Sequence, residues 1–230
     1  MDPESRLRIV TALSTVADDE VDPSLCGTCA ALLGMRGAAI TVMTAADHRG
    51  VLCSSNATAA ALEDLQATLG EGPGIDAHRR GVPVGEPDLA NPRRSKWLAF
   101  CGPAVAAGAA AVFAFPLRVG GVRLGVLTLN HDRRGVLSGA QHADALVVVD
   151  VVTHAVLAIQ ADAPPGMVAG ALAAVVDDRV EVHQAAGMAA VRLGVSVGEA
   201  FVRLRALAYA EERPLADVAR DVIARRVRLS

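Results

Sequence analysis

The sequence is poor in aromatic residues, in lysine and in net charge. Only 3% of its 230 residues are aromatic, which argues against a surface built from stacked aromatic side chains, as many single-stranded RNA modules use. Lys96 is the single lysine, beside 21 arginines. The net charge is −3, so the chain as a whole gives no sign of nucleic-acid binding. The residues after Pro164 are slightly basic, which permits a polyanionic partner without demanding one.

Long apolar runs and targeting signals are also missing. No stretch of about 20 apolar residues is free of charges or breaks. The longest run, residues 98–117, is interrupted by Gly102-Pro103, Gly108 and Pro116. The first five residues show neither a basic nor an apolar region of a signal peptide. We therefore expect a cytoplasmic protein with no membrane partner.

What the sequence does have is a large apolar fraction. Apolar residues make up 52% of the chain, which excludes a disordered protein and is enough for a real core. The length allows one large domain or two small ones. Pro164-Pro165-Gly166 is the clearest break. We therefore expect a first domain at 1–163 and a second at 164–230.

Four cysteines are present, at positions 26, 29, 53 and 101. In a cytoplasmic chain we expect them to be reduced. Cys26 and Cys29 form a lone Cys-x-x-Cys, without the second pair or close histidines that zinc requires. They lie on an apolar helix stripe with Leu25 and Leu32, so the simplest interpretation is two small core residues. Redox chemistry and metal binding are the alternatives.

Apolar periodicity predicts a mixed α and β first domain. Gly120-Gly121 between two strong strands indicates a tight hairpin. A stripe of Leu146, Val149, Val152 and Val156 on the last helix predicts a homodimer seam. The predicted helices are 4–17, 22–34, 57–69, 75–80, 95–107 and 139–161, and the predicted strands are 38–43, 51–54, 82–84, 110–119 and 122–130.

Three helices are predicted for the second domain. The first covers about 167–193 and ends at Gly194. The second begins after Ser196, which forms a capping-box pattern with Glu199. The third begins at Pro214 and has apolar residues on one face. These patterns predict a small all-α domain.

Two resemblances cover nearly the whole chain. The element order, with the segments 65–77, 81–84 and 88–89, resembles a GAF domain, which is a PAS-like sensory module. The segments 184–188, 194–196, 199–201, 204–205 and 214–219 resemble the ANTAR family. The fold class implied is α+β, a GAF antiparallel sheet with flanking helices, followed by a small all-α three-helix ANTAR domain.

The resemblance implies a function. GAF–ANTAR proteins are signal-responsive transcription antitermination regulators, whose ANTAR domain binds paired RNA hairpins in nascent transcripts under control of a GAF sensor. It implies an unknown small-molecule signal as a further partner. No catalytic residue, metal or cofactor is expected, so the protein is not expected to be an enzyme.

The candidate RNA-binding residues lie on the first two helices of the tail. Gly187 is surrounded by alanines, which suits close approach of RNA or of another helix. Arg192 and Arg205 have no acidic residue four positions away, whereas Arg203 has Glu199 as a partner. The candidate set is Gln184, Ala185, Gly187, Arg192, Arg203, Arg205 and Tyr209, and the candidate GAF pocket residues are Arg79, Arg94, Trp97 and Phe113.

Other functions stay open. The ANTAR family usually has a lysine where this chain has Ala186. Loss of that cation motivates an alternative, a GAF sensor whose tail is a protein-interaction module with reduced or lost RNA binding. Some GAF domains reduce free methionine sulfoxide with cysteines, for which Cys53 and Cys101 would be the suspects. A DNA-reading helix-turn-helix is a further rival, weakened because the tail is barely basic.

Overall fold

A five-stranded antiparallel sheet forms the centre of the first domain. The computed structural model describes residues 7–13, 24–43, 49–91, 97–162, 170–211 and 213–227. The strand order is β2-β1-β5-β4-β3, and every neighbouring pair is antiparallel. The strands are β1 Gly37–Met43, β2 Arg49–Ser54, β3 Val84–Glu86, β4 Ala111–Val119 and β5 Val122–His131.

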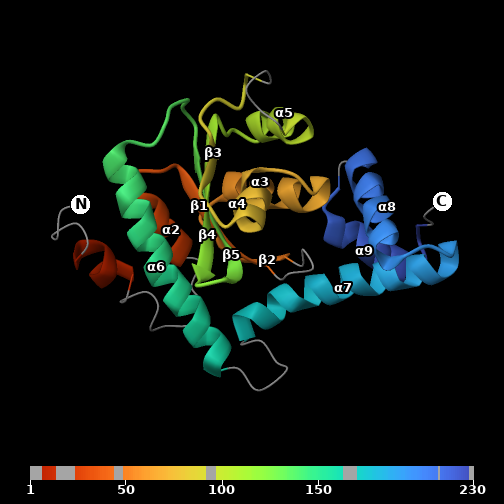
Figure 1. The fold of residues 1–230 in the computed structure, drawn as a ribbon. Helices are drawn as coiled ribbons and strands as arrows, with labels where there is room; N and C mark the ends of the chain where they lie inside the picture. Colours follow the sequence, from red (N-terminus) through yellow and green to blue (C-terminus); the bar gives the residue numbers. More distant parts are fainter. Residues whose placement is uncertain are drawn as a thin grey trace.

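Helices cover both faces of this sheet (Figure 1). Helices α2 (Ser24–Leu32) and α6 (Gly139–Asp162) lie on one face, together with the helical residues 7–13. Helices α3 (Ala57–Leu69), α4 (Pro73–Arg80) and α5 (Leu98–Ala106) lie on the other. The predicted α+β class and sheet are therefore confirmed.

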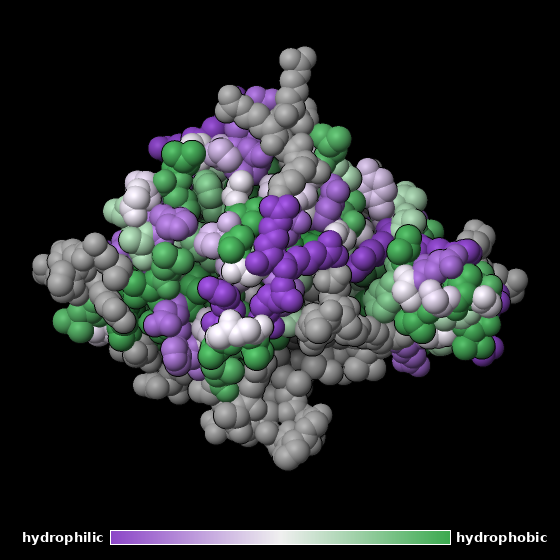
Figure 2. Space-filling model, viewed as in Figure 1, coloured by the Kyte–Doolittle hydropathy of each residue, from purple (hydrophilic) through white to green (hydrophobic). Residues whose placement is uncertain are grey.

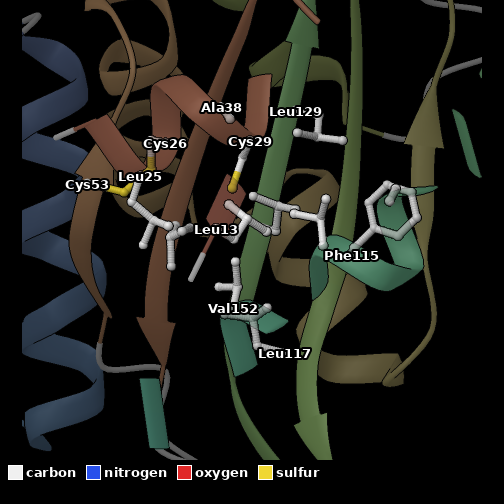
Figure 3. Close-up of a cluster of buried hydrophobic side chains, with 14 of the residues drawn as sticks. Leu13, Leu25, Cys26, Cys29, Ala38, Cys53, Phe115, Leu117, Leu129 and Val152 are labelled. Carbon is white, nitrogen blue, oxygen red and sulfur yellow. A yellow bond between two sulfur atoms is a disulfide. The ribbon is translucent and has the colours of Figure 1, made fainter. Parts of the chain in front are cut away.

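The main apolar core lies between the sheet and α2 and α6 (Figure 3). Strand side chains alternate between the two faces, so Ile40, Leu127 and Leu129 point into this core and are fully buried. Trp97 and Phe100 belong to a separate apolar cluster on the α3 and α5 side. The sheet therefore has a packed core on each face.

The cysteine prediction is wrong at one pair. Cys26 of α2 and Cys53 of β2 form a disulfide, across a sequence separation of 27 residues (Figure 3). Cys29 is a free thiol in the same core, as predicted for a small apolar residue, and burial raises its pKa to about 12. The disulfide ties α2 to an edge strand, and no local pattern in the sequence marks it.

Helix α6 is a core helix of this chain. Of the stripe predicted as a dimer seam, Val152 and Val156 are buried and Val149 packs against the core, while Leu146 is 48% exposed. Most of the stripe therefore packs against the sheet of its own chain. Among the described residues, Gly139–Leu157 of α6 is long and apolar enough to span a membrane, but core helices pass the same criterion.

Three helices form the second domain: α7 (Gly170–Leu193), α8 (Val197–Ala210) and α9 (Leu215–Ile223). Ser196 caps α8, since its hydroxyl accepts a hydrogen bond of 3.1 Å from the backbone N–H of Glu199. Small residues let the helices approach closely. The core consists of Ala185, Ala186, Ala189, Ala190, Ala200, Leu204, Ala208, Val218, Ala219 and Val222.

The two domains touch at two places. Helix α7 runs beside β2, and the C-terminal half of α3 faces α8 and α9 (Figure 1). The predicted boundary at Pro164-Pro165-Gly166 lies outside the described residues. On the face drawn in Figure 2, hydrophilic residues gather over α3 and α4, and apolar and hydrophilic residues lie side by side over the C-terminal helices.

Candidate nucleic-acid interface

The outer face of α7 carries three of the predicted RNA-binding residues. Gln184 and Arg192 are exposed, and Gly187 is partly exposed between them. A Cβ added at Gly187 would meet no atom within 4 Å, so this glycine opens a surface and is not required by packing. Gly187 and Arg192 line the same hollow between α7 and the end of α9.

Two alanines of the same helix face inward. Ala185 and Ala186 are fully buried in the three-helix core. Ala185, predicted to contact RNA, therefore offers RNA no surface. Ala186 stands where the family usually has a lysine, yet here its methyl group packs among apolar neighbours. Because position 186 is buried in this chain, the alanine there does not remove a positive charge from the exposed face of α7.

The α8 candidates have different surroundings. Arg203 Nη2 lies 2.8 Å from Glu199 Oε1, which confirms the expected ion pair. Arg205 is half-buried, and a Cβ at Gly70 would lie 3.0 Å from its Nη1. Gly70 ends α3, and helix C-termini favour cations. Arg205 thus lies against the first domain, while Tyr209 is 55% exposed.

Most described arginines of the tail are engaged with carboxylates. Arg213 and Arg226 bind Asp221 at 2.6 and 2.7 Å, and Arg220 binds Glu181 and Asp217 at 2.9 and 2.8 Å. Within the described part of the chain, Arg192 and Arg225 form no ion pair, and both line the hollow between α7 and α9. Positive charge available to a polyanion is therefore concentrated there. Sequence spacing missed Arg225.

The two arginines paired with Asp221 lead us to expect that the stability of the second domain depends on pH. Hydrogen bonds from Arg213 and Arg226 hold the pKa of Asp221 below its usual value of about 3.9. Because the folded-state pKa is lowered, this carboxylate stabilises the fold above about pH 4, and that stabilisation is lost as pH falls toward the lowered pKa. We expect Asp221→Asn to lower the thermal midpoint at pH 7, with the gap to wild type closing below about pH 4. A gap of constant size in thermal melts down to the acid limit would contradict this.

A buried polar network joins strand β1 to helices α3 and α4 of the first domain. Thr41 Oγ1 donates to Glu63 Oε2 at 2.7 Å, and Gln66 Nε2 donates to Glu63 Oε1 at 2.8 Å. The backbone N–H of Gly74 donates to Gln66 Oε1 at 2.6 Å. A Cβ at Gly72 would lie 2.7 Å from Gln66. Residues 70–72 therefore turn over Gln66, and Pro73 and Gly74 begin α4.

The predicted pocket residues are not brought together. Trp97 is buried in the cluster beside α3 and α5, whereas Phe113 packs against the core on the other face. Arg79 is exposed on α4, and its carbonyl accepts a hydrogen bond from Arg123. Arg94 lies outside the described residues. The sequence missed the Glu63 network, although Glu63 and Gln66 stand three residues apart on one helix.

The described residues offer no group of His, Cys, Asp and Glu side chains that could hold a metal. Cys53 and Cys101, the suspects for methionine sulfoxide reduction, lie in different apolar clusters, and Cys53 is bonded to Cys26. The structure therefore does not assemble that pair into one site.

Comparison with known proteins identifies both domains. Residues 170–223 match the family model of the ANTAR domain. No curated protein matches the chain. Among solved structures, the GAF domain of an Acinetobacter phosphoenolpyruvate-protein phosphotransferase has a TM-score of 0.52 at 12% identity, over 71% of this chain and 99% of that chain.

Further solved structures are similar at lower scores. The phycoerythrobilin-bound GAF domain from a cyanobacterial phytochrome has a TM-score of 0.49 at 16% identity, over 68% of this chain and 95% of that one. Free methionine-R-sulfoxide reductase from Neisseria meningitidis, in complex with its substrate, has a TM-score of 0.43 at 13% identity, over 67% of this chain and 91% of that one. The similarity to the Acinetobacter GAF domain shows the fold of the first domain, and the family match shows an ANTAR domain at residues 170–223. The sequence patterns predicted both.

Proposed function

We propose that this chain, a GAF-fold domain joined to an ANTAR domain, is a signal-responsive transcription antitermination regulator that binds RNA hairpins. The observation that carries the proposal is the match of residues 170–223 to the ANTAR model. The three-helix fold of those residues agrees with it. The boundaries proposed for the two domains are 1–163 and 164–230, and the protein acts by binding rather than by catalysis.

The RNA-binding surface proposed here is centred on the outer face of α7. Gln184 is exposed and can donate and accept hydrogen bonds at a base edge or a phosphate. Gly187 opens a surface beside it, and Arg192 supplies a cation without a carboxylate partner among the described residues. Tyr209, which is exposed on α8, is proposed as a secondary contact. Arg203 is engaged by Glu199 and is left out of the proposed surface.

Control by the sensor domain is proposed to act through the contact between α3 and α8. Arg205 lies against Gly70 at the end of α3, so a shift of α3 changes how much of that guanidinium RNA can reach. The signal is proposed to be a small molecule bound by the GAF domain. Because α3 also carries the Glu63 network at its middle, a ligand that disturbs the network would act on the same helix.

Two further proposals concern the setting. We propose a cytoplasmic protein, because its RNA partner is a nascent transcript. We also propose a homodimer, although the α6 stripe that suggested one is mostly buried in the chain's own core. Light scattering at micromolar concentration tests the dimer, and a monomer mass would remove it without affecting RNA binding.

Selection from a pool of RNA hairpins tests the proposed function. The full chain is immobilised and offered stems that carry randomised loops, with a DNA pool of the same design as competitor. We expect RNA hairpins with a shared loop motif to be enriched at low salt, because phosphate contacts weaken as salt rises. Arg203→Ala, which removes an arginine already paired with Glu199, should enrich the same motif. Failure to enrich any RNA would favour the protein-interaction alternative.

A further inference from the structure

The hollow between α7 and the end of α9 has the size of a ligand site. Its volume is about 660 Å³, within the range of pockets that hold small molecules. Residues 187–193 of α7 form one wall, and Val222, Arg225 and Val227 form the other. Gly187 leaves open space in this wall, and the side chain of Val191 is 86% exposed. Within the described part of the chain, the hollow therefore has an apolar floor that is open to solvent.

The rim of the hollow is cationic. Among the described side chains of the tail, Arg203, Arg213, Arg220 and Arg226 are paired with carboxylates. Arg192 and Arg225 form no such pair in that part of the chain, and they belong to opposite walls of the hollow. Arginine binds phosphate through a planar fork of donors and stacks on flat π-systems. An apolar floor below two such groups suits a flat ligand with anionic edges.

The backbone conformation of Arg225 also supports a role for its side chain at the hollow. Its φ is +59°, and it is the one non-glycine residue with a positive φ among the described residues. It follows the end of α9, where its N–H donates to the carbonyl of Val222 at 3.0 Å. This left-handed position after a helix usually belongs to glycine. A large cation stands here where glycine would cost less, and a backbone outlier of this kind motivates a functional hypothesis for the guanidinium.

We propose that this hollow receives one unstacked base of an RNA hairpin loop, with Arg192 and Arg225 on its flanking phosphates. The proposal rests on the proposed function and names the part of the RNA that is recognised. Loop nucleotides can be splayed out of the stack, and protein modules recognise them by base edge and face. The apolar floor near Gly187 and Val191 takes the base face. A paired stem keeps its bases stacked and cannot fill the hollow.

The test is a titration with a hairpin enriched in the selection, carrying 2-aminopurine at single loop positions. Unstacking raises the fluorescence of this base, so we expect an increase at one loop position on binding to the full chain. Arg225→Gly should weaken binding by about tenfold or more, with a thermal midpoint equal to or above that of wild type. Gly187→Leu should fill the hollow, weaken binding and abolish the fluorescence increase.

Controls separate the possible failures. Arg203→Ala should bind within about twofold of wild type, because this arginine is already paired with Glu199 and does not line the hollow. Equal affinity of wild type, Arg225→Gly and Gly187→Leu would overturn the hollow as the base site while leaving RNA binding intact. Absence of RNA binding by wild type at low salt would overturn the proposed function and this site together.

Discussion

Replacing Gly125 with alanine is expected to unfold the GAF-fold domain. Gly125 of β5 pairs with Val42 of β1 at the centre of the sheet. A Cβ at Gly125 would lie 2.1 Å from the carbonyl oxygen of Thr41 and 3.0 Å from the Cα of Val42. These are backbone atoms of a paired strand, so neither can move without loss of the ladder. We expect a loss of more than about 4 kcal/mol in the free energy of unfolding, measured by urea titration.

The matched control is Gly102→Ala in α5. Gly102 is exposed and a Cβ there would meet no atom within 4 Å. Alanine favours a helix over glycine by about 1 kcal/mol, so this variant should be as stable as wild type or slightly more so. If Gly125→Ala unfolds at the urea midpoint of wild type, the paired register of β1 and β5 described above is wrong.

Loss of the bond between Cys26 and Cys53 is expected to be the second large effect. The bond closes a loop of 27 residues' separation, and chain entropy alone predicts about 3–4 kcal/mol of stabilisation for such a loop. We therefore expect the double variant Cys26→Ala with Cys53→Ala to lose about that amount. A reducing agent should destabilise wild type by a similar amount and leave the double variant unchanged.

The free thiols give this experiment its control. Burial raises the pKa of Cys29 to about 12, so its thiol stays protonated and should resist alkylation in the native state. Mass spectrometry after alkylation without reductant should therefore find Cys26 and Cys53 joined and Cys29 unlabelled. Equal urea midpoints with and without reductant would show that the bond does not stabilise the protein.

Local signals were sufficient for most of the fold. Helix 57–69 was predicted with its observed bounds, because its leucines repeat at helical spacing and the glycine-rich segment 70–74 stops it. Gly120-Gly121 marked the hairpin between β4 and β5, and Ser196 with Glu199 marked the start of α8. In each case the residues that determine the element lie within a few positions of one another.

Features that depend on tertiary neighbours could not be predicted. An apolar stripe such as that of α6 has the same pattern whether it meets its own sheet or a second copy, so the dimer seam was inferred from residues that the core uses. Cys26 and Cys53 each fit a local core pattern, and only the packing of α2 against β2 brings them together. Gly70, against which Arg205 lies, is far from it in the sequence.

Only part of the candidate RNA surface could be predicted from the sequence, because the rest depends on residues that packing brings together. Helical spacing identified Arg192 and Gly187, since both are on one helix and their neighbours in sequence are known. It could not join them to Arg225, which reaches the hollow from α9 through a left-handed backbone conformation. Spacing also could not show that Ala185 points into the core, where it meets Ala200 and its neighbours.

Single-round transcription in vitro tests the central claim most directly. The template places a hairpin enriched in the selection so that it overlaps an intrinsic terminator, and the full chain is added at concentrations that saturate the RNA. The account predicts that readthrough rises with wild type, rises equally with Arg203→Ala and rises much less with Arg225→Gly at the same concentration. Readthrough that stays at the level without protein, on RNA shown to be saturated, would contradict the assignment of this chain as an antitermination regulator.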